Sequence, residues 1–181
     1  MVPKRSHELT HHLANVNKQA YSDLRNAIRD ELKKSDITAS ELERGGFKYD
    51  LDNVVPYIEK TGNLWDALVE YEAKERGYGE NAEEEVVARC CESFLANDVF
   101  IDSFAKKHFK SAKAISSFLT QLSADMNQLF TDADIRAAKT NKWINESPEQ
   151  QILSQVANVQ EIAQKWSRAV RSEERRVGKE C

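Results

Sequence analysis

Apolar residues recur at spacings of three and four positions over most of this chain, which is the period of an amphipathic helix. The clearest case is the stretch 18–34, where one face carries Tyr21, Leu24, Ile28 and Leu32. We therefore predict a helix over this stretch, with these side chains in the core. No pair of segments shows the strict alternation of paired strands, so the predicted fold class is mainly α.

Start and stop signals extend this prediction along the chain. An N-terminal helix is expected from about residue 3 to residue 16. Later helices are expected over residues 64–76, 81–95, 98–105, 110–130, 132–144 and 148–170. Asn63 and Asn81 stand where N-caps are favoured. The segment 35–60 is less regular, because Gly45-Gly46 interrupts it and Pro56 argues against a long helix.

Composition limits the class of protein. The chain has 181 residues, of which 31% are charged and 40% hydrophobic, which suits one helix-rich domain with a real core. The net charge is −4, and the sequence shows no stripe of basic residues. Nucleic acid is therefore not favoured as a partner. No apolar run is long enough to span a membrane, and the first residues lack the apolar part of a signal peptide. We expect a soluble protein, cytoplasmic rather than secreted.

The three cysteines do not form a disulfide pattern, because Cys90 and Cys91 are adjacent. Both lie on the apolar face of the predicted helix 81–95, together with Val87. This position favours small core residues over metal ligands.

The chemistry of the chain is concentrated near its start, in His7-Glu8-Leu9-Thr10-His11. On a helix, a spacing of four puts both histidines on one face, where two imidazoles can bind one Zn²⁺. Glu8 lies beside them and can act on a water at an open coordination position. The plain alternative is an exposed helix that carries two histidines by accident, and the neighbouring His12 is expected at the surface.

A site of this kind needs a third protein ligand, and the acidic run Glu83-Glu84-Glu85 offers candidates. On a helical wheel Glu84 lies nearer the apolar face of its helix. The run also fits a solvated first turn that compensates the helix dipole.

The pairing of His7-Glu-Leu-Thr-His11 with Glu85-Val-Val-Ala88 resembles the zincin metallopeptidases whose third ligand is a glutamate. The run from the motif to Leu95 is also similar to peptidase-like domains in polyproteins of phages and other mobile elements. The resemblance covers about residues 5–125.

The resemblance implies a zinc metallopeptidase that acts on a peptide or protein. It implies His7, His11 and Glu85 as metal ligands and Glu8 as general base, with Ala88 allowing the two helices to approach closely. Glu84 remains the rival third ligand. This chain departs from the pattern at Arg89, where many of these enzymes have an aspartate that supports a ligand histidine.

Zincin folds usually place a small sheet before the motif helix, yet only six residues precede His7. The expected fold is therefore a helical zincin-like domain that lacks most of its N-terminal sheet, with a core over residues 1–130. Residues 131–170 are expected to add helices. Residues 171–181 resemble a translated sequencing adapter and are expected to be an artefactual tail.

Two other classes of function compete with a peptidase. One is a helical interaction or structural module of a phage or mobile-element polyprotein whose metal site has decayed. The other is a helical scaffold that binds no metal.

Overall fold

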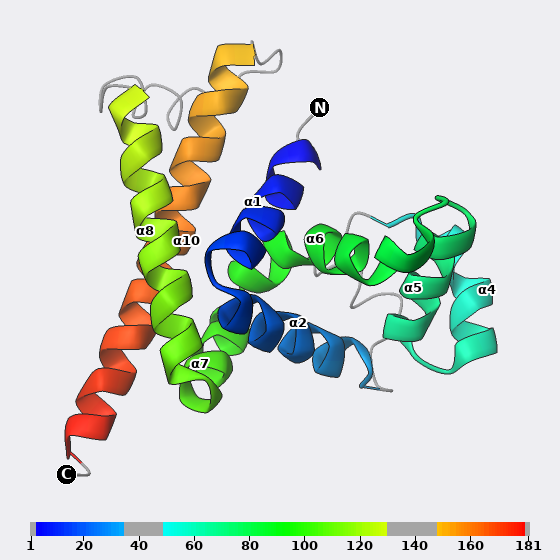
Figure 1. The fold of residues 1–181 in the computed structure, drawn as a ribbon, viewed down its shortest axis with the longest axis horizontal. Coiled ribbons are helices and arrows are strands. Elements are labelled where there is room, and N and C mark those ends of the chain that lie inside the picture. Colours follow the sequence, from blue (N-terminus) through cyan, green and yellow to red (C-terminus); the bar gives the residue numbers. More distant parts are fainter. Residues whose placement is uncertain (1–2, 35–48, 130–147, 180–181) are drawn as a thin grey trace. The chain divides into compact units, whose positions relative to one another are not determined.

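The computed structural model describes residues 3–34, 49–129 and 148–179 (Figure 1). Over these residues the chain is helical and contains no strand, which confirms the mainly α class. The chain divides into two compact units, one from Pro3 to Asn97 and one from Asp98 onward. The boundary near residue 130 that the sequence suggested stays a prediction, and the predicted helix 132–144 lies outside the described residues.

The first unit is built around α6 (Ala82–Leu95), which is contacted by α1 (Pro3–Val16), α2 (Lys18–Leu32) and α5 (Leu64–Lys74). A short 3₁₀ turn, η1 (Gly79–Asn81), leads from α5 into α6. The buried side of α2 consists of Ala20, Leu24, Ile28 and Leu32, which confirms three of its four predicted core residues. Cys90 and Cys91 on α6 are both buried, as expected of core residues.

Side-chain caps fix where two of these helices begin. Asn17 accepts a hydrogen bond from the backbone N–H of Ala20 at 2.9 Å, and Asn63 accepts one from Asp66 at 2.9 Å. Asn81 occupies the N-cap of α6 as predicted, but its side chain makes no capping bond. These caps satisfy backbone donors that the first turn of a helix leaves open.

The sequence predicted no long helix around Pro56, and the structure has a helix of average length there. Pro56 lies inside α4 (Leu51–Thr61), an eleven-residue helix that ends at Gly62 in the left-handed conformation, with φ of 81°. Proline removes the hydrogen bond to the carbonyl four residues earlier, which here belongs to Asp52 in the first turn. Asp52 and Pro56 are both exposed, so water can bond that carbonyl and the helix continues. Residues 35–48, including Gly45-Gly46, lie outside the described residues.

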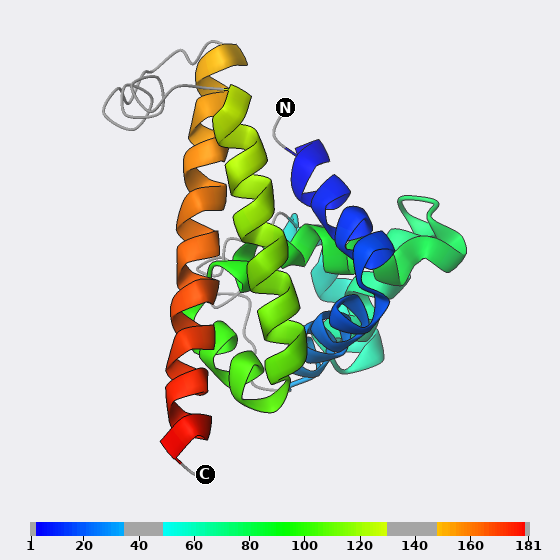
Figure 2. The ribbon, with the colours of Figure 1, turned by 60° about the vertical axis from the view of Figure 1, so that its left-hand side comes forward.

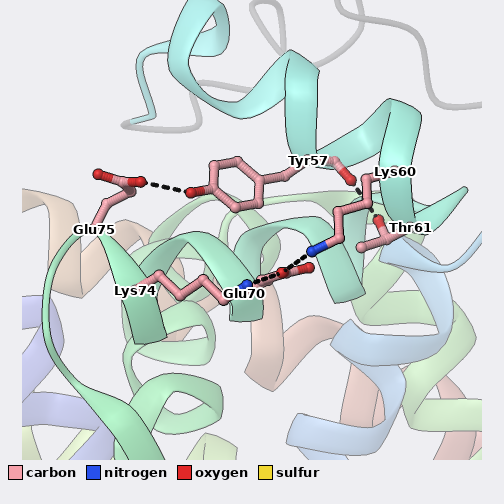
Figure 3. A network of polar contacts seen from close by, with 6 residues as sticks. All are labelled: Tyr57, Lys60, Thr61, Glu70, Lys74 and Glu75. Carbon is pink, nitrogen blue, oxygen red and sulfur yellow. Dashed lines mark hydrogen bonds and ion pairs between the residues drawn. The ribbon is translucent and has the colours of Figure 1, made fainter.

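Helix α4 packs on α5, and charged side chains join the two (Figure 3). Glu70 on α5 accepts hydrogen bonds from both Lys60 of α4 and Lys74 of its own helix. The bond from Lys60, followed by that from Lys74, lowers the pKa of Glu70. Tyr57 of α4 donates a hydrogen bond to Glu75, just after the end of α5, at 2.6 Å.

The second unit contains α7 (Asp98–Lys107), α8 (Phe109–Leu129) and α10 (Pro148–Lys179). The long helices α8 and α10 lie side by side, and α7 packs against both (Figure 2). Trp166 on α10 is fully buried, and its ring meets Phe104 of α7 edge-on with 5.5 Å between centroids. Among the described helices, none is both long and apolar enough to cross a membrane.

Helix α10 does not stop at Val170, where the sequence predicted its end. It continues to Lys179, through most of the suspected adapter-derived tail. Glu173 is buried there and accepts a hydrogen bond from Arg176, while Glu174 pairs with Lys113 of α8 at 3.2 Å. The artefactual origin of this segment stays a prediction.

Replacing Trp166 with alanine should destabilise the second unit by about 3–5 kcal/mol, because a buried aromatic ring is lost and a cavity remains. Urea unfolding followed by circular dichroism measures this. The matched control is Val99→Ala, whose side chain is 80% exposed and whose removal should change stability by less than about 0.5 kcal/mol. Similar losses in both variants would contradict the packing described here.

Candidate metal centre

The motif helix and the acidic helix lie against each other. Helix α1 carries residues 7–11 and packs on α6, which carries Glu83, Glu84 and Glu85 in its first turn (Figure 1). The side chains of His7 and Glu8 lie outside the described part of the structure, although their backbone belongs to α1. The described part of the site consists of His11 and residues of α5 and α6.

The sequence predicts an apolar stripe of Leu9, Leu13 and Val16 on α1, and the inward face of this helix differs from it. Leu13 is buried as expected, but Val16 is 62% exposed, and the buried neighbour of Leu13 is Thr10, at 3% exposure. Residues 10 and 13 are three positions apart and share one side of the helix, which is therefore its buried side. Sequence reasoning missed Thr10 because a lone threonine carries no apolar signal.

His11 reaches α6 at Glu84. The Nδ1 atom of His11 lies 4.0 Å from Oε2 of Glu84, and about half of each side chain is exposed. This contact is an ion pair when His11 is protonated. At the surface such a pair contributes only about 0–1 kcal/mol to stability.

Glu85 lies on the other side of the same turn. Its side chain is 8% exposed, and its carboxylate stands 3.9 Å from Nη2 of Arg89, one turn further along α6. Arg89 is held much more closely by Glu72 of α5, with Nε 2.6 Å from Oε1. The guanidinium of Arg89 therefore interacts more strongly with Glu72 than with Glu85.

Among the charged residues of the first unit whose burial the structure describes, Glu72 is the most deeply buried, with no exposed side-chain surface. Neither of its carboxylate oxygens receives a well-aligned hydrogen bond from the described residues. The nearby positive charge of Arg89 therefore stabilises the carboxylate. Beside them, the pKa of Tyr49 is raised, first by burial and then by the neighbouring Cys90 and Glu72. Burial likewise raises the pKa of the Cys90 thiol, which makes this thiol a poor nucleophile.

The structure brings His11 next to Glu84 at the contact between α1 and α6, while Glu85, the next residue of α6, is buried beside Arg89. The described residues contain no cluster of three histidine, cysteine or acidic side chains that is placed to hold a metal. The predicted ligand set includes His7, so this set is not tested. Glu72 was missed from the sequence, because a glutamate one position after Tyr71 looks like a residue of the solvated face.

Comparison with known proteins adds no assignment, since no family model, no curated protein and no solved structure matches the chain.

Arg89→Met should destabilise the first unit by about 3–5 kcal/mol, because it leaves the Glu72 carboxylate buried without its counter-charge. The double variant Glu72→Met/Arg89→Met should recover most of this loss, since removing both charges also removes the cost of burying them. Urea unfolding of both single variants and the double variant gives the coupling energy. Additive losses would contradict the pairing.

Proposed function

We propose that the chain is a zinc-dependent metallopeptidase-like domain that hydrolyses peptide bonds. One observation carries the proposal: the His-Glu-x-x-His helix packs on the helix that bears Glu84 and Glu85, with His11 reaching that acidic turn. The donor types fit the metal, because imidazole nitrogen and carboxylate oxygen are its usual ligands in hydrolytic sites.

The contacts suggest different roles for the two glutamates. Zinc-binding histidines commonly donate their second ring N–H to a carboxylate, which fixes the tautomer and orients the ring. Glu84 faces Nδ1 of His11, which leaves Nε2 for the metal. Glu84 would then take the supporting role that an aspartate fills in many zincins, at the position where this chain has Arg89.

Glu85 remains our proposed third ligand, together with His7 and His11. Its carboxylate is largely shielded from water, where a negative charge gains most from a cation. Arg89 should compete with a metal less strongly at Glu85 than at Glu72, because its closest nitrogen lies 3.9 Å from the Glu85 carboxylate and 2.6 Å from that of Glu72.

A Zn²⁺ ion at this position would polarise the peptide carbonyl and lower the pKa of a water toward neutrality. Glu8 would accept the proton of that water and pass it to the leaving amine. The exposure of His11 and Glu84 keeps this face of the contact open to a peptide.

The alternative is a non-catalytic helical module of a phage or mobile-element polyprotein, with a decayed metal site. The observation that favours it is the Glu85–Arg89 ion pair, because a nearby guanidinium competes with a metal for the carboxylate. The described residues also form no strand, which a zincin cleft uses to hold its substrate.

Zinc binding tests the ligand set. The purified chain should bind about one zinc, and Ala substitution of His7, His11 or Glu85 should weaken its affinity by orders of magnitude. Glu84→Ala should weaken affinity by only about 10–100-fold, as expected of a supporting residue. Competition with a chromophoric chelator measures these values.

His12→Ala is the matched control, because His12 lies on the same helix, is exposed and is outside the motif. Its zinc affinity should equal that of the parent chain. If Glu84→Ala removes zinc and Glu85→Ala does not, Glu84 is the ligand. Full retention in all variants would exclude the zincin proposal.

Catalysis is tested with Glu8→Gln, which keeps the size of the side chain but cannot accept the proton. This variant should retain zinc and lose hydrolysis of a quenched fluorescent casein substrate, a loss of at least about 100-fold for an essential base. A parent chain that binds zinc without chelator-sensitive hydrolysis would support the non-catalytic module.

A further inference from the structure

A cleft of about 580 Å³ opens beside the α4–α5 contact, and the residues that line it include none of the proposed metal ligands. Its wall combines three tyrosines with charged side chains. The residues that line it include Asp52, Tyr57, Tyr71, Glu75, Arg76 and Tyr78. Figure 3 shows one part of this wall, where Tyr57 extends from α4 toward Glu75. Neither the motif nor the proposed peptidase function accounts for the cleft.

Two of the rings form a corner. The rings of Tyr57 and Tyr71 lie 6.0 Å apart at an angle of 77°. Tyr71 is buried and is further supported by Tyr49, which meets it edge-on at 6.3 Å. Because Tyr57 also donates its hydroxyl to Glu75 at 2.6 Å, the corner and the carboxylate are held together as one surface.

The chain itself shows what this corner accepts. The guanidinium carbon of Arg76 lies over the ring of Tyr71, 5.9 Å from its centroid. The face of an aromatic ring is electron-rich and attracts cations, and the planar guanidinium suits it particularly well. Arg76 belongs to the Arg76-Gly77-Tyr78-Gly79 turn, in which Gly77 and Gly79 have positive φ.

The charges along the wall are unequal. Asp52 and Glu75 carry two negative charges, whereas Arg76 supplies one positive charge. Aromatic walls with an excess carboxylate attract cationic side chains. We propose that this cleft binds an arginine side chain of a polypeptide, stacked on the tyrosines and paired with Glu75. This inference does not depend on the metal site.

Arginine is favoured over lysine for two reasons. Its planar guanidinium stacks on rings and can bond a carboxylate through two N–H groups, whereas an ammonium is a strongly hydrated point charge. Arg76 would compete with the incoming side chain for the face of Tyr71, so the cleft should bind more tightly when Arg76 is absent.

The test is a titration of the ¹⁵N-labelled full chain with a capped glycine–serine peptide that carries one central arginine. The same peptide with citrulline keeps the shape and removes the charge. The arginine peptide should shift the amide signals of α4 and of the turn after α5 in a saturable way. Equal binding of the citrulline peptide would overturn the proposal.

Variants test where the peptide binds and whether the cleft prefers a positively charged group. Glu75→Gln and Tyr78→Ala change exposed residues and should each weaken binding about two- to fivefold, while Arg76→Ala should strengthen it. Glu59→Gln, an exposed carboxylate of α4 outside the cleft wall, should change nothing. Unchanged affinity in Glu75→Gln, or weaker binding in Arg76→Ala, would overturn the proposal, the latter in favour of an anionic ligand.

Discussion

The arrangement of the first unit depends on the buried ion pair between Glu72 and Arg89. A charge with no exposed surface is tolerated only when a counter-charge lies beside it, and these two groups lie 2.6 Å apart. The pair joins α5 to α6 at one register. It also fixes the rotation of α6 about its own axis, because Arg89 must face α5 for the pair to form.

This rotation decides what the acidic turn presents to α1. Neighbouring residues of a helix point about 100° apart, so Glu84 and Glu85 point in different directions. With Arg89 turned toward α5, Glu85 lies one turn below it on the shielded side, and Glu84 is left at the edge where His11 stands. A residue of α5 thus sets the geometry of a contact between α1 and α6.

The sequence predicted the helices well, because their apolar spacing is a local signal. It predicted the buried side of α2 and the cap at Asn63 for this reason. It did not predict the helix through Pro56, where exposure lets water replace the lost hydrogen bond. It was wrong at Val16, whose hydrophobicity does not reveal that its side chain is exposed. It also ended the last helix too early, because residues 171–181 resemble a translated sequencing adapter and were left out of the predicted fold.

The candidate site was harder to predict, because its parts lie far apart in the sequence. The motif defined His7, Glu8 and His11, while the expectation that α1 meets the acidic helix came from the family resemblance. The role of Arg89 was not predictable, since it requires knowing that Glu72 faces α6.

This role bears on the competing functions. Arg89 lies 2.6 Å from Glu72 and 3.9 Å from Glu85, so one guanidinium stands beside two shielded carboxylates. A metal ion at Glu85 would have to compete with this guanidinium. The competition is weaker there than at Glu72, because the attraction between two charges falls with the distance between them.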